Sequence, residues 1–300
     1  MKRLGSMRHL MCSFGLLAIP SITFAQDPVN KPVVYAPGVE IARLANQKIT
    51  ESSGIAAGRV RADVFFTHND SGDKPRFFAF NEKGDDLGTF NVIGAEAKDW
   101  EDMASFSLDN KNYLLFADVG DNAAKRKSLK LYIVLEPMIN AGANKLIAVD
   151  VTVETCIEFS YEDGSHNCET VMVDPANKKI LLVSKSMSQE CAVYELPLTV
   201  SGDPVQVVAK RIAVLNISVT TGGDLSPNNH CAIISTYVDA YEYVRLPTQN
   251  WAEAFALAPR VVKLPKRKQG EAICYGLDGK ALYLTSEQLP SPLFKIQPVD

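Results

Sequence analysis

The stretch "DWEDMASF" (residues 99–106) places three carboxylates directly before a run of residues that favours a β-strand. Four other segments share its pattern, in which a polar and usually acidic residue stands two positions before an aliphatic one. They are "ESSGIAAG" from 51, "NCETVMVD" from 167, "TGGDLSPN" from 221 and "QGEAICYG" from 269. The aligned aliphatic residues are 48, 68, 54 and 48 positions apart: Ile55, Met103, Val171, Leu225 and Ile273. A motif that returns about every 40 to 50 residues is typical of β-propeller blades.

The sequence after each motif repeats as well. A short run of mostly apolar, β-favouring residues ends in a polar cluster, and a second such run follows. The first runs are "DVFFTHND", "NYLLFADV", "KILLVSKS", "CAIISTYV" and "ALYLTSEQ". Since no long 3.6-residue amphipathic pattern occurs after residue 25, we expect little helix. The pattern therefore predicts an all-β chain with four antiparallel strands in each repeat.

The two ends of the repeat region complement each other. The last repeat stops at Asp300 without a fourth strand, whereas "GVEIARLA" (38–45) precedes the first repeat without partners. Pairing the two would close a ring and remove exposed sheet edges. We therefore predict a five-bladed β-propeller of four-stranded antiparallel blades, closed by an N-terminal strand, over residues 38–300. A pair of stacked β-sandwiches is the alternative.

The N-terminus has the features of a secretory signal. Lys2, Arg3 and Arg8 precede the apolar run "LMCSFGLLAI", and small residues precede a cut after Ala25. We expect residues 1–25 to be removed, residues 26–37 to form a linker, and the protein to be periplasmic or secreted. Cleavage changes the formal net charge from −4 to −7, which disfavours nucleic acid and anionic membranes as partners. We expect a monomer without membrane insertion.

Five cysteines follow the expected cleavage point, an odd number for an exported chain. The pairing preferred from the sequence is Cys168 with Cys191, because both begin strands at the same rim. They are nevertheless two strands apart, a separation of about 9.5 Å that a disulfide does not span unless a loop folds back. The remaining three are Cys156, Cys231 and Cys274.

The positions two residues before the aligned aliphatic ones predict a ring around the axis, because the first strand of each blade lines the channel. Carboxylate and hydroxyl oxygens suit Ca²⁺, whereas no His/Cys cluster has zinc spacing. The alternative is that these carboxylates cap backbone amides of neighbouring blades. The predicted metal ligands are Ser53, Glu101, Glu169, Asp224, which follows a glycine at the ring position, and Glu271.

Second strands end at the same rim, because successive strands run antiparallel. Three residues there are candidates for proton transfer: His68, Asp70 and Asp118. "THNDSGD" is also a common turn composition, so a purely structural role stays open. The other rim residues are candidates for contacting a ligand: Asn69, Asp121, Asn122, Lys185, Tyr237 and Glu287. Trp100 is expected to pack between blades.

The run "ESSG…THNDSG…DWEDMA…VGDN", with "TGGDLSP" and "GEAICYGLDGKALYLTSE", resembles a family of exported bacterial propeller proteins that are mostly uncharacterised or described as TolB-like or WD40-like. More distantly, it is similar to the calcium-activated nucleotidases, or apyrases. Those propellers are five-bladed and hold an axial calcium ion with Glu and Ser. The similarity implies a metal ring at Ser53, Glu101, Glu169 and Glu271. It does not imply nucleotide hydrolysis, because no match to the arginine-rich phosphate site is present.

Two functions remain open at this level, since a fold alone does not choose between them. The first is a binding or envelope-scaffold module with an acidic axial Ca²⁺ site that receives a small molecule or an envelope protein. The alternative is a Ca²⁺-dependent hydrolase of a small phosphorylated or lactone-like substrate, with the metal as Lewis acid.

Overall fold

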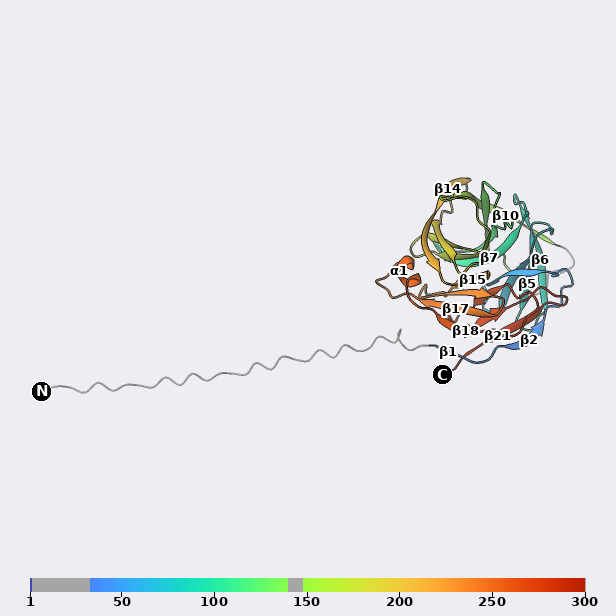
Figure 1. The fold of residues 1–300 in the computed structure, drawn as a ribbon. Helices are drawn as coiled ribbons and strands as arrows, with labels where there is room; N and C mark the ends of the chain where they lie inside the picture. Colours follow the sequence, from blue (N-terminus) through green and yellow to red (C-terminus); the bar gives the residue numbers. More distant parts are fainter. Residues whose placement is uncertain (2–32, 140–147, 300) are drawn as a thin grey trace. The chain divides into compact units, whose positions relative to one another are not determined.

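A computed structural model describes Met1, residues 33–139 and residues 148–299, and these residues are almost entirely β-structure (Figure 1). Apart from Met1, the predicted signal segment lies outside them. Within the described part, one short helix occurs, α1 (Trp251–Phe255), capped by Asn250 and Glu253. No helix there is long and apolar enough to cross a membrane.

The first two repeats form four-stranded antiparallel meanders, each of which follows the chain order. Meander 1 contains β3 (Ser52–Ala57), β4 (Val64–Asn69), β5 (Arg76–Asn81) and β6 (Asp86–Ile93). Meander 2 contains β7 (Trp100–Leu108), β8 (Lys111–Asp118), β9 (Leu129–Leu135) and β10 (Val149–Tyr161). The β7–β8 turn consists of Asp109 and Asn110, both with positive φ. A two-residue hairpin turn of type I′ requires positive φ at both residues, and Asp and Asn tolerate it.

The next two repeats follow the same plan. Meander 3 contains β11 (Cys168–Asp174), β12 (Lys179–Ser184), β13 (Cys191–Pro197) and β14 (Val205–Leu215). Meander 4 contains β15 (Thr220–Leu225), β16 (Cys231–Thr236), β17 (Asp239–Val244) and β18 (Arg260–Lys263). The helix α1 lies in the connection between β17 and β18.

Meander 5 joins the two ends of the chain. It contains β19 (Ile273–Tyr275), β20 (Leu282–Leu284), β21 (Pro292–Ile296) and, as its outer strand, β2 (Val39–Arg43) from the N-terminal side. A second contact between the ends pairs β1 (Val34–Tyr35) with β22 (Pro298–Val299). The strand expected at 38–45 therefore pairs where the sequence suggested.

Hydrophobic packing occurs between neighbouring meanders. Each of the five buried clusters draws its side chains from two of them: meanders 1 and 2, 2 and 3, 3 and 4, 4 and 5, and 5 and 1. The first strands also contact one another in this cycle, β3 with β7, β7 with β11, β11 with β15, β15 with β19 and β19 with β3. This arrangement is propeller-like and is not that of two stacked sandwiches.

Two details differ from the sequence-based expectations. β10 and β14 are long strands. Residues 149–152 of β10 pair in parallel with β6, and residues 157–161 of β10 pair in parallel with β14, so meanders 1, 2 and 3 join in one sheet. The predicted Cys168–Cys191 disulfide is absent, and all five described cysteines are free. The cause is β12, which lies between the strands that begin with Cys168 and Cys191.

Candidate axial cation site

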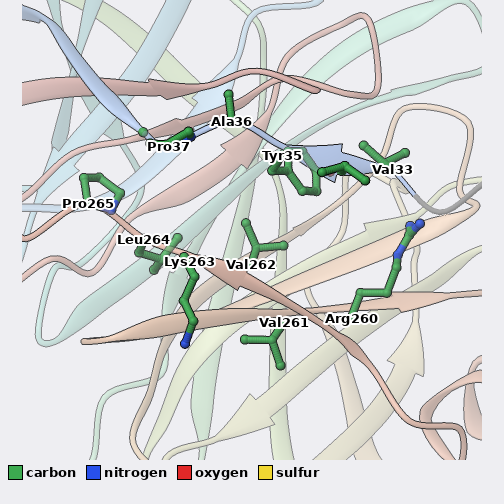
Figure 2. Close-up of a pocket in the computed structure, with 12 residues that line it drawn as sticks. Val33, Tyr35, Ala36, Pro37, Arg260, Val261, Val262, Lys263, Leu264 and Pro265 are labelled. Atoms are coloured by element: carbon green, nitrogen blue, oxygen red, sulfur yellow. The ribbon is translucent and has the colours of Figure 1, made fainter. Parts of the chain in front are cut away.

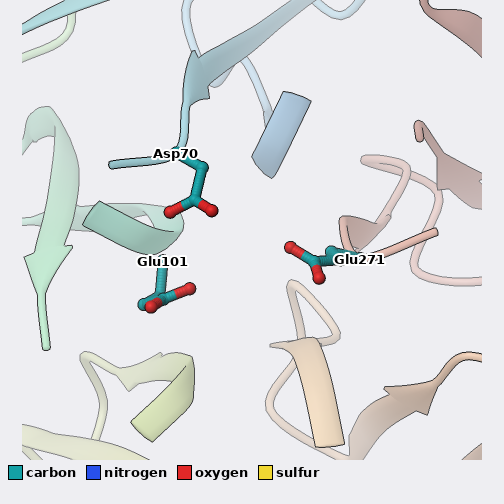
Figure 3. A group of neighbouring side chains, drawn as sticks. All are labelled: Asp70, Glu101 and Glu271. Atoms are coloured by element: carbon teal, nitrogen blue, oxygen red, sulfur yellow. The ribbon is translucent and has the colours of Figure 1, made fainter. Parts of the chain in front are cut away.

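Three carboxylates converge at one end of the first strands (Figure 3). Glu101 comes from β7, Glu271 precedes β19, and Asp70 follows β4. One oxygen atom of each lies within 4.8 Å of the others. We call Asp70, Glu101 and Glu271 the mouth cluster. Opposite carboxylate oxygens on a Ca²⁺ ion, each about 2.3 to 2.6 Å from it, are separated by about 5 Å, so the three oxygens fit around one such ion.

The mouth cluster is surrounded by further carboxylates. Glu101 is 4% exposed and shares a hydrogen bond with Glu169, and burial followed by repulsion from Glu169 raises the pKa of Glu101 far above its usual range. Burial also raises the pKa of Glu169. On the other side, Glu287 hydrogen-bonds Glu271, and burial and that neighbour raise the pKa of Glu287 to about 8. Two pairs of carboxyl groups thus share hydrogen bonds across the mouth, as expected where negative charge is not fully compensated.

Lys185 provides a positive charge beside this group. Its Nζ lies 3.1 Å from Glu169 and donates to the hydroxyl of Tyr237 at 3.3 Å, and Tyr237 donates to Glu271 at 2.9 Å. Among the described residues, no member of the mouth cluster forms an ion pair with Lys, Arg or His. No basic side chain therefore competes for the three carboxylates, and a cation that binds them would take the place of the proton that the raised pKa of Glu101 favours.

Gly120 leaves space for two of the carboxylates. A Cβ atom at this position would overlap the carboxylates of Glu101 and Asp99. Burial, followed by repulsion from Asp70, raises the pKa of Asp99. The backbone of Gly120 is held by its own N–H, which donates to the carbonyl of Asp99 at 3.1 Å. Because Gly120 has no side chain, the carboxylates of Glu101 and Asp99 can lie against its backbone, near the place where an ion would bind.

The predicted metal ligands are only partly brought together. Glu101 and Glu271 join the mouth cluster, and Glu169 lies beside it but is engaged by Lys185. The hydroxyl of Ser53 donates to the carbonyl of Glu101 at 2.6 Å, so its contact is with the strand rather than with the carboxylates. Asp224 is not in the cluster: its carboxylate accepts the backbone N–H of Tyr275 at 3.0 Å. Adjacent residues of a strand face opposite sides, so a residue next to the ring position turns toward the neighbouring strand.

The structure does not place the three predicted proton-transfer residues together at an open site. His68 is 0% exposed, lies edge-on to Trp100 and Phe116, and burial lowers its pKa. Its expected place in an open funnel was wrong, because the side chain is packed between meanders 1 and 2. Asp118 is also 0% exposed and pairs with Arg126 at 2.8 Å. Asp70 belongs to the mouth cluster instead.

The predicted rim residues divide into three groups. Lys185, Tyr237 and Glu287 lie at the mouth as described. Asp121 and Asn122 line a neighbouring cavity of about 550 Å³, which Lys185 also borders. The side chain of Asn69 is already hydrogen-bonded within the protein. Its oxygen accepts the backbone N–H groups of Thr50 and Glu51, and its NH₂ group donates to the carbonyl of Lys48 and the carboxylate of Asp73.

Sequence reasoning missed the role of Asp102, which is fully buried one residue after Glu101. Its carboxylate accepts N–H groups from Met103 at 2.8 Å, Val171 at 3.0 Å and Gly223 at 3.3 Å, and so links β7, β11 and β15. It also missed Asn167, which donates to Glu169 at 2.9 Å and accepts the amide of Asp121 at 2.7 Å. In the sequence, Asp102 and Asn167 stand out only as polar residues near the start of a strand, and nothing there indicates their hydrogen-bond partners.

Comparisons with known proteins show no family for this chain. No protein-family model matches the chain, and no curated protein is similar to it in sequence. Among solved structures, a Xanthomonas campestris protein described as a gluconolactonase important in glucose secondary metabolic pathways has a TM-score of 0.47 and 10% identity, over 90% of this chain and 99% of that one. The Dos1 propeller has a TM-score of 0.41 and 6% identity, over 88% and 94%. The resemblance to TolB-like proteins and apyrases stays a prediction.

Proposed function

We propose that the chain forms a closed propeller of five blades, each of them one of the meanders described above. The proposal is supported by the cycle of contacts among the first strands and by the five hydrophobic clusters, each shared by two neighbours. It is also supported by the pairing of β2 with β21, which gives the last meander its fourth strand. In such a ring the mouth cluster lies at one end of the central channel.

The mouth cluster is proposed to bind one Ca²⁺ ion. The observation that carries this proposal is the convergence of three carboxylates, two of them nearly buried, without an ion-paired Lys, Arg or His among the described residues. The donor set is all oxygen, which suits a hard cation, and Gly120 leaves the space that the carboxylates need. Asp70, Glu101 and Glu271 would hold the ion. Asp99 would add negative charge next to it, and Glu169 would lie beside it in its ion pair with Lys185.

The protein is proposed to act as an exported binding module whose axial ion orders the ligand-receiving face. This function is favoured over hydrolysis by the burial of His68 and by the ion pair of Asp118, because a general acid or base must reach its substrate. Export is inferred from the basic and apolar pattern of residues 1–25. The partner or small molecule would meet the acidic face around Glu271 and Glu287.

Isothermal titration of the purified protein with CaCl₂ tests the ion site. We expect one Ca²⁺ per chain, and we expect Glu271→Gln to weaken binding at least about tenfold, a loss of about 1.4 kcal/mol. Glu40→Gln is the matched control, because Glu40 is exposed on β2 and belongs to a different surface. Failure of the wild-type protein to bind Ca²⁺ at millimolar concentration would refute the proposed site.

A further inference from the structure

A groove separates the N-terminal segment from the outer strand of meander 4 (Figure 2). One wall is residues 33–38, and the other is residues 260–265, which include β18. The volume of the groove is about 530 Å³. The walls meet where Gly38 approaches Pro265, because a Cβ on Gly38 would lie 2.8 Å from the proline ring. We call this feature the β18 groove.

The edge of β18 that faces away from β17 has no strand partner. In the described part of the chain, β18 is the last strand of its sheet and pairs with β17 alone. The N–H and C=O groups of every second residue of an edge strand point outward and can pair with an added strand. The side chain at the centre of this strand, Val261, is 54% exposed, and Val34 across the groove is 60% exposed. The groove thus offers a backbone ladder together with apolar side chains.

The two walls are fixed to each other beneath the groove. Tyr35 of the N-terminal wall donates to the carboxylate of Glu242 at 2.8 Å, and Arg260 of β18 lies 2.6 Å from that carboxylate. Glu242 is 2% exposed and also accepts the hydroxyl of Tyr275 at 2.7 Å. A recognition surface that is already held in place loses less conformational entropy on binding. The groove is therefore preformed.

The charge next to the groove is opposite to that of the whole chain. The formal net charge of the sequence is −4, yet "KLPKRK" (263–268) carries basic residues and no acidic one. Lys263, Lys266 and Lys268 are exposed; Lys263 pairs with Asp239 at 2.9 Å, whereas Lys266 forms no ion pair among the described residues. An acidic strand would be attracted here, whereas a second β18 edge would bring like charges together.

We propose that the β18 groove binds an extended acidic segment of a partner protein, which adds a strand to the free edge of β18. Strand addition uses the backbone for affinity and the alternate side chains for selection. The added strand would lie between Val34 and the outer edge of β18, next to Val261, and acidic side chains near the groove rim would face Lys266. The groove is formed by other residues than the mouth cluster, so this proposal does not depend on the ion.

A synthetic seven-residue peptide that alternates valine with glutamate is a suitable probe, used with the full purified protein. We expect hydrogen exchange of the amides in residues 260–264 to slow when the peptide binds, because a new ladder protects them. A peptide with lysine in place of glutamate is expected to bind at least about tenfold more weakly. Two further versions carry N-methyl groups on opposite edges, and at least one of them is expected to lose binding by a similar factor.

Variants locate the site. Lys266→Glu is expected to weaken the acidic peptide about threefold to tenfold, while Lys111→Glu, an exposed lysine in the β7–β8 hairpin, leaves it unchanged. Unchanged exchange at residues 260–264, or binding of both N-methylated peptides as tightly as the unmodified peptide, would overturn the proposal. So would concentration-dependent protection of these amides without peptide, because it would show a second copy of the chain as the occupant.

Discussion

Glu101 and Asp102 are neighbours in β7 and both are buried, but their surroundings differ. The Asp102 carboxylate accepts N–H groups from three strands, and these hydrogen bonds offset part of the burial that raises its pKa. The Glu101 carboxylate meets Glu169 and lies close to Asp70 and Glu271. A buried carboxylate that receives backbone N–H groups stabilises the structure around it, whereas one that faces other carboxylates needs a proton or a cation. Asp102 thus stabilises the fold, and Glu101, the residue before it, is available for a ligand.

The largest expected effect comes from removing the Asp102 carboxylate, which tests its role in linking the strands. We expect Asp102→Ala to lower the free energy of unfolding by about 3 to 5 kcal/mol, because buried N–H groups in three strands lose their acceptor. Urea denaturation measures the effect. Asp203→Ala, at an exposed position, is the control and should stay within about 0.5 kcal/mol of the wild type. A loss below about 1 kcal/mol for Asp102→Ala would show that the carboxylate does not link the strands.

A side chain at Gly120 would disturb Glu101, the second carboxylate of the comparison. Gly120→Ala is expected to cost about 1 to 3 kcal/mol of stability, because the new methyl group must displace Glu101 and Asp99. It should also abolish the heat of Ca²⁺ binding. Ser71→Ala, exposed on the neighbouring loop, should change neither property. Normal Ca²⁺ binding by Gly120→Ala would contradict the role of this space.

The comparison also predicts a pH dependence. The pKa of Glu287 in the folded protein, about 8, is above its unfolded value, so the folded state holds the proton more tightly. Its contribution to stability is complete below pH 4 and is lost as the pH rises through 8; the raised pKa values of Glu101 and Glu169 act in the same direction. With EDTA present, the free energy of unfolding should fall by about 1 to 2 kcal/mol between pH 5 and pH 8.

Urea melts across this range measure the fall. Added CaCl₂ should reduce it, because a bound cation compensates the ionised carboxylates. Glu287→Gln should make the EDTA curve flatter. A stability that rises steadily from pH 5 to pH 8 in EDTA would be the opposite of this expectation.

The smallest expected effect comes from Lys185. Lys185→Gln removes the ammonium group that neutralises Glu169 and should lower stability by about 1 kcal/mol. It should strengthen Ca²⁺ binding severalfold, because the mouth becomes more negative by one charge. Lys125→Gln, exposed on a loop of meander 2, serves as the control in the same titration. Weaker Ca²⁺ binding by Lys185→Gln would mean that the lysine supports the site.

Much of the strand arrangement could be predicted because apolar runs and polar ends repeat along the chain. The register of the motif also identified Glu101 and Glu271 correctly as residues at one end of the first strands. Asp224 stands one residue after the ring position, so the alternation of side chains along a strand already turned it to the other face, and its inclusion among the ligands overlooked this rule. The burial of His68 depends on Trp100 and Phe116 from the next meander, which no local pattern reveals.

Asp70 illustrates a different limit. Its place follows from the turn after β4, which Asn69 fixes by bonding the backbone at Lys48, Thr50 and Glu51. A turn composition indicates that the chain reverses but not where a side chain points. The same holds for the long strands β10 and β14, whose parallel pairing depends on how adjacent meanders meet at their outer edges.

Thermal unfolding with increasing CaCl₂, measured on the wild type, Glu101→Gln and Asp102→Asn, tests the central claim most directly. The wild type should gain stability that grows with the logarithm of the Ca²⁺ concentration above its dissociation constant, about 2.7 kcal/mol at a hundredfold excess. Asp102→Asn should begin less stable and keep the same gain. Glu101→Gln should begin at least as stable as the wild type and gain little. Equal gains for Glu101→Gln and the wild type, or no gain for any of the three, would contradict the account.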